Sequence, residues 1–137
     1  MRSQHMDWSQ QEAPSLDDFE ALAADAFALL PAEFRVLTGD IIFVVQDFPD
    51  EDVIRDMELE SEFDILGLFH GPDLGARVAN HGAPEPTMIL PYRRPILDYW
   101  AEHKEPLGSV VRHVLVHEVG HHFGLSDDQM EAIEAAE

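Results

Sequence analysis

Hydrophobic residues recur every three or four positions in two long segments of the chain, and this spacing predicts amphipathic helices. The first segment opens with a helix-start signal at Ser15, carries apolar positions from Phe19 to Leu30, and stops at Pro31. The second begins near Leu107 or Gly108, and its buried side is expected to consist of valines and a leucine: Val110, Val111, Val114 and Leu115. Shorter helices are predicted within residues 50–60 and from Pro95 to just before Pro106.

Three short runs rich in apolar and β-branched residues predict strands, at residues 41–45, 65–69 and 87–90. We expect the first to be well buried and the other two to pair as a wide hairpin around a long Gly- and Pro-rich loop over residues 71–86. The edge strand, either 67–70 or 87–90, could bind an extended peptide as an additional strand. The predicted fold is therefore α+β, with a small mixed sheet of three or four strands packed against several helices.

The length of 137 residues predicts one domain, spanning residues 15–137 after a flexible leader at residues 1–14. The leader lacks the apolar core of a signal peptide, and the longest apolar run, 41–45, is too short to cross a bilayer. A cytoplasmic location is expected. The sequence does not indicate an oligomeric state and is compatible with a monomer.

The chain is strongly acidic, with 8 Lys and Arg against 28 Asp and Glu and a formal net charge of −20. A field of this sign repels phosphate backbones and anionic lipids, so nucleic acids and membranes are not expected as partners. It attracts cations and basic peptide segments instead. The absence of cysteine excludes thiolate metal sites.

One motif indicates a metal site: His117-Glu118-Val119-Gly120-His121, within the second predicted long helix. Helical positions four apart lie on one face, so the two imidazoles can share a divalent ion, and Glu118 stands about 100° around the helix, where it can hold a metal-bound water. Zinc would activate that water and polarise a scissile carbonyl, while Glu118 transfers the proton as the catalytic base. A catalytic zinc usually has three protein ligands, so a third is required.

Gly124 is placed to end the helix and turn the chain back, and Asp127 follows it closely. We favour Asp127 as the third ligand. Asp128, Glu131 and Glu134 remain as alternatives. The segment 126–129 also predicts a helix start with a capping box, in which Asp127 would be an ordinary first-turn acid.

Further polar residues are candidates for secondary roles. His113 continues the stripe of His117, and we expect it to be a buried histidine with a hydrogen bond elsewhere rather than a neighbour of the metal site. His122 faces away from His121 and is expected to be structural. Three residues are candidate donors to an oxyanion, namely Tyr92, Arg93 and Tyr99. Two histidines, His70 and His81, flank the long loop.

The stretch 112–128 resembles the active-site segment of the small bacterial zincin-like metallopeptidases, also called minimal zincins. It matches their pattern His-Glu-x-x-His-x-x-Gly-x-x-Asp at His117, Glu118, His121, Gly124 and Asp127. Residues 67–71 and 91–97 also look similar to that family, and the resemblance covers about residues 15–135. It implies a compact α and β fold, zinc held by His117, His121 and Asp127, and Glu118 as the base. It does not imply a particular substrate.

The leading hypothesis is a zinc-dependent metallopeptidase that cleaves a peptide or protein substrate. A non-catalytic, metal-stabilised module that binds a protein partner is one alternative. A zinc-dependent ribonuclease of the kind that carries His-x3-His and a third histidine is another, but Asp127, Glu118 and the negative charge all oppose it.

Overall fold

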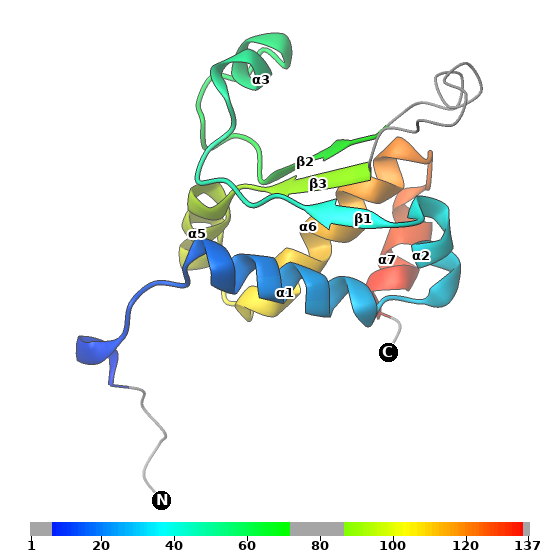
Figure 1. Ribbon diagram of the computed structural model, residues 1–137. Coiled ribbons are helices and arrows are strands. Elements are labelled where there is room, and N and C mark those ends of the chain that lie inside the picture. Colours follow the sequence, from blue (N-terminus) through cyan, green and yellow to red (C-terminus); the bar gives the residue numbers. More distant parts are fainter. Residues whose placement is uncertain (1–6, 72–86, 136–137) are drawn as a thin grey trace, which may run out of the picture.

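The computed structural model describes residues 7–71 and 87–135, and it has an α+β architecture, as the sequence predicts. A small sheet forms one layer, and α1, α2, α5, α6 and α7 lie together on one side of it (Figure 1). The short helix α3 (Glu51–Asp56) stands apart from that helical layer. Within the described ranges, none of the helices is long and apolar enough to span a membrane.

The sheet contains three strands in the order β1-β3-β2, namely β1 (Ile41–Phe43), β3 (Thr87–Pro91) and β2 (Gly67–His70). β3 is central. It pairs in parallel with β1 and antiparallel with β2, so the sheet is mixed and the predicted hairpin pairing is confirmed. Phe43, Ile89 and Phe69 lie in register across the three strands and pack on the helical layer.

The strand order corrects two expectations. Residues 87–90 were one of two candidates for an edge strand, but β3 is flanked on both sides, and β2 is an edge. Strand β1 is the other edge rather than a well-buried strand, and Ile42 on its outer face is 49% exposed. A run of β-branched residues fits an edge strand when only one of its faces packs on helices.

Helix α1 (Leu16–Ala28) begins as predicted, with Ser15 and Asp18 forming a reciprocal capping box. The helix α2 (Ala32–Thr38), which the sequence pattern did not predict, follows Pro31 directly. It has only seven residues, of which Phe34 and Thr38 are buried, so its apolar spacing is too short to stand out. Phe19, Ala23 and Phe34 join these two helices to the core.

Three further helices complete the helical layer: α5 (Arg93–Glu102), α6 (Leu107–His122) and α7 (Asp127–Ala135). Helix α6 is central to the fold, because it packs against α1, α5, α7 and the sheet. Its buried side includes the expected Val110, Val111, Val114 and Leu115. Because this side is buried, the opposite side of α6, which carries the histidines, has a fixed position relative to β2 and α7.

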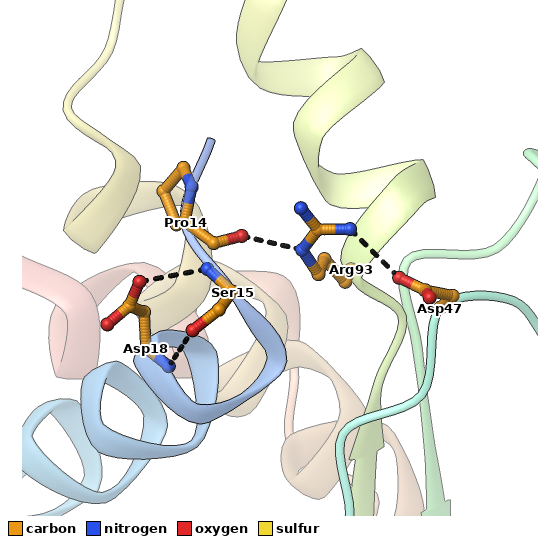
Figure 2. A network of polar contacts seen from close by, with 5 residues as sticks. All are labelled: Pro14, Ser15, Asp18, Asp47 and Arg93. Carbon is orange, nitrogen blue, oxygen red and sulfur yellow. Dashed lines mark hydrogen bonds and ion pairs between the residues drawn. The ribbon is translucent and has the colours of Figure 1, made fainter. Parts of the chain in front are cut away.

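Arg93 ties the start of α1 to the start of α5 (Figure 2). Its Nε donates to the Pro14 carbonyl at 2.6 Å, and its Nη1 donates to Asp47 Oδ1 at 3.0 Å. Residues that are distant in the sequence are thereby joined at one corner of the domain. The leader prediction for residues 1–14 is not tested by this contact, although residues 8–10 form a short exposed 3-10 turn.

Candidate metal centre

Helix α6 carries His117 and His121 one turn apart, near its carboxyl end. Their ring centroids are 5.6 Å apart, and the ring planes are nearly perpendicular at 85°. Two imidazoles that share a tetrahedral zinc at about 2.0–2.1 Å have centroids roughly 5 Å apart. The separation of the two rings is therefore close to that of two imidazoles bound to one zinc ion.

Glu118 lies between these two histidines in the sequence and is half-buried. Burial raises the pKa of its carboxyl to about 7, because the charged form loses solvation. The edge strand β2 approaches it closely, since a Cβ built on Gly67 would lie 3.7 Å from Glu118 Cγ. A carboxyl of this pKa can both accept and return a proton near neutral pH.

The chain turns sharply after α6, as the sequence predicts. Gly124 has a φ of +73°, which is the left-handed conformation that glycine adopts most easily. Ser126 then opens α7: its Oγ accepts from the Gln129 amide at 3.1 Å, while Gln129 Oε1 accepts from the Ser126 amide at 2.8 Å. The predicted capping box is confirmed, and α7 folds back against α6.

Asp127 is the first residue of α7, and its side chain is exposed. Among the described residues, it does not belong to a group of three potential ligands that already lie close together. The carboxylate that contacts His113 and His117 belongs to Glu134, which is one of the alternatives to Asp127 as the third ligand. The assignment of Asp127 as third ligand stays a prediction.

Glu134 bridges two histidines of α6. Its Oε1 lies 2.8 Å from His113 Nδ1, and its Oε2 lies 3.1 Å from His117 Nε2. The expectation that His113 is a buried histidine is wrong, because 47% of its side chain is exposed and its ring lies against that of His117, with centroids 3.9 Å apart. The four-residue spacing from His117 was the signal in the sequence for the ring contact of His113. The contact of Glu134 with these histidines depends instead on the path of α7.

The three candidate oxyanion donors differ in where they lie. Tyr92 is fully buried, and its hydroxyl has no hydrogen-bond partner in the part of the chain that the structure describes. Burial, together with the negative charges of Asp50 and Glu118, raises the pKa of Tyr92 to about 12. Arg93 is engaged with Pro14 and Asp47, and Tyr99 stacks on His103 with ring centroids 3.8 Å apart.

Two further histidines, His70 and His122, lie at the end of β2. The His122 ring packs on Phe69 with centroids 4.2 Å apart, and its expected structural role stays a prediction. His70 ends β2 and is exposed. His81 and the predicted long loop, apart from Gly71, lie outside the described residues.

Comparison with known sequences places these elements in a family. The sequence model of the zincin-like metallopeptidases matches residues 38–136, a segment that begins before β1 and includes α6 and α7. No curated protein sequence gives a significant match to the chain. The family match thus covers the whole sheet and both helices of the candidate metal centre.

Proposed function

Because this chain belongs to the zincin-like metallopeptidase family, we propose that it is a zinc-dependent peptidase that hydrolyses internal peptide bonds of an extended substrate. The observation that carries this proposal is the arrangement on α6, where two histidines one turn apart flank a half-buried glutamate whose pKa is near neutral. A glutamate that served only solubility would gain nothing from burial, since burial penalises its charged form.

In this proposal His117 and His121 hold zinc, with Asp127 as the third protein ligand. The nitrogen and carboxylate donors suit zinc, and the chain has no thiolate to compete for it. Bound zinc would supply Lewis acidity to the scissile carbonyl and lower the pKa of a coordinated water. Asp127 stands only three residues beyond the Gly124 turn, at the start of the helix that folds back against α6.

Glu118 is the proposed catalytic base. Its carboxylate accepts the proton of the attacking water and later returns it to the leaving amine. A carboxyl with a pKa of about 7 is suited to both transfers at neutral pH. The adjacent edge strand keeps one side of Glu118 away from solvent, since a Cβ at Gly67 would lie 3.7 Å from Glu118 Cγ.

Strand β2 is the proposed substrate-binding edge. It pairs only with β3 within the described sheet, and its first residue lies beside Glu118. An extended peptide that hydrogen-bonded to this edge would run past the base, with backbone contacts that do not depend on side-chain identity. The net charge of −20 favours substrates with basic residues near the cleaved bond. Nucleic-acid and membrane partners are not proposed.

The test compares zinc-reconstituted wild-type protein with Glu118→Gln on a broad peptide library, with new termini detected by mass spectrometry. Glu118→Gln should retain zinc and fold, and its hydrolysis should fall by about 100-fold or more, which is the usual range for loss of a general base. Glu20→Gln, which changes an exposed glutamate of α1, is the matched control and should keep full activity.

Two outcomes would contradict the peptidase proposal. Undiminished hydrolysis by Glu118→Gln would remove the base from the mechanism. Absence of cleavage by the wild-type protein across the library, with zinc bound, would favour the non-catalytic binding module instead.

A further inference from the structure

Helix α6 offers two overlapping pairs of histidines rather than one. His113, His117 and His121 follow each other at intervals of four residues, so all three lie along one side of the helix. The centroid of the His117 ring is 3.9 Å from that of His113 and 5.6 Å from that of His121. His117 therefore belongs to both pairs, and the family motif accounts only for the second.

Glu134 completes the first pair. The three ligand atoms offered by His113, His117 and Glu134 all lie within 4.8 Å of one another. The two nitrogen-to-oxygen distances are 2.8 Å and 3.1 Å, whereas ligands of a tetrahedral zinc are roughly 3.3 Å apart. A zinc ion could replace the protons that lie between Glu134 and the two histidines if the carboxylate and the rings moved apart by a few tenths of an ångström.

Two contacts between α6 and α7 hold Glu134 in place. Met130 is fully buried against Gly120, where a Cβ would come within 2.8 Å of Met130 Cγ, so the two helices approach closely. One turn further on, the Arg112 side chain donates to the Ile133 carbonyl at 3.0 Å. Glu134 follows directly in the chain, so its backbone is positioned before any ion binds, which reduces the entropic cost of binding.

The neighbouring rings leave room for the required adjustment. His113 and His117 would have to separate by roughly 1 Å to reach the spacing of two zinc-bound imidazoles. His113 can move in this way because 47% of its side chain is exposed, while Glu134 is 23% exposed. Water can reach the cluster and supply a fourth ligand.

We propose that His113, His117 and Glu134 form a second zinc site, which shares Nε2 of His117 with the peptidase site so that only one of the two is filled at a time. The second site lacks His121 and Asp127, so an ion held there is outside the ligand set proposed for hydrolysis. The chain would thus store zinc in an unproductive position one helical turn from the productive one. This inference concerns metal binding and does not require that the protein cleave peptides.

The experiment removes the peptidase site and measures what remains. Zinc is titrated into His121→Ala in competition with a chromophoric chelator, and circular dichroism confirms the fold of each variant. His121→Ala should still bind about one equivalent. His121→Ala/Glu134→Gln and His121→Ala/His113→Ala should each bind at least tenfold more weakly. The matched control is His121→Ala/Glu20→Gln, which makes the same change at an exposed glutamate of α1 and should bind like His121→Ala.

Either of two results overturns the second site: His121→Ala that binds no zinc, or a Glu134→Gln double variant that binds as tightly as its Glu20→Gln counterpart. Cobalt(II) provides a separate readout, because a site with two nitrogens, a carboxylate and water should give a visible absorption band in His121→Ala that disappears with His113→Ala. Failure of the peptidase proposal would appear as missing hydrolysis in the wild-type protein and would leave these binding measurements unchanged.

Discussion

Gly67 on the edge strand faces Glu118 on the site helix so closely that a Cβ at position 67 would lie 3.7 Å from Glu118 Cγ and 2.7 Å from Val114 Cγ1. The first distance is an ordinary contact, and the second is a steric clash. Glycine at this position therefore sets how near β2 can come to α6. The same approach half-buries Glu118 and thereby raises its pKa.

Gly67→Ala should destabilise the protein by about 1–3 kcal/mol, since an added methyl group has to displace Val114 in a packed core. Gly67→Ala/Val114→Ala should recover part of this loss relative to the sum of the single changes. Gly108→Ala is the control, because nothing lies within 4 Å of a Cβ there and alanine favours the helix. Urea unfolding measures the wild type and the four variants, including Val114→Ala alone, and an additive double variant would contradict the contact.

The buried carboxyl of Glu118 predicts a pH dependence of stability in metal-free protein. Its pKa is raised from 4.5 to about 7, so the folded state holds the proton more tightly than the unfolded state does. The resulting stability is complete below about pH 4.5 and is lost as the pH rises through 7. Glu118→Gln lacks this loss. Its free energy of unfolding should therefore increase relative to wild type between pH 4.5 and 7 and then level off.

Urea unfolding of both proteins in the presence of a chelator, at intervals from pH 4 to 8, checks this difference. Subtracting the two curves cancels the other titrating groups. Parallel curves would mean that Glu118 is as well solvated in the folded protein as in the unfolded chain.

The third zinc ligand can be identified once Glu134 is removed from competition. In a Glu134→Gln background, Asp127→Ala should lower zinc affinity by tenfold or more, whereas Asp128→Ala should have little effect. The two aspartates are adjacent, exposed and in the same first turn of α7, so they are closely matched. A larger effect from Asp128→Ala would move the assignment, and loss of both zinc and hydrolysis in Glu134→Gln alone would make Glu134 the ligand.

Tyr92 is not expected to assist hydrolysis, despite its place among the candidate oxyanion donors. Its side chain is fully buried, and its hydroxyl lacks a hydrogen-bond partner within the described ranges. Removing an unsatisfied buried hydroxyl is neutral or stabilising by about 1 kcal/mol. Tyr92→Phe should therefore be at least as stable as the wild type and keep its hydrolysis rate, and a large fall in rate with unchanged zinc content would restore Tyr92 to the mechanism.

The sequence predicted the elements with long or regular apolar patterns. The helix start at Ser15, the buried valines of α6 and the left-handed turn at Gly124 are all local features, because each depends on residues within a few positions. The family resemblance was confirmed by the match over residues 38–136.

Features that depend on distant contacts were missed or misjudged. Whether Ile42 is exposed is set by which strand takes the centre of the sheet, and a β-branched run does not contain that information. Glu134 reaches His117 only because Met130 packs on Gly120 and returns α7 along α6. His113 was misplaced for the same reason, since its partner lies 21 residues further along the chain.

Elemental analysis of protein purified without added metal tests the central claim, that α6 carries a zinc site. The wild-type protein should contain close to one equivalent of zinc, because two sites that share His117 hold only one ion. His117→Ala, which removes the shared ligand, should contain almost none. Less than about a tenth of an equivalent in the wild-type protein, with failure to take up zinc on reconstitution, would contradict the account.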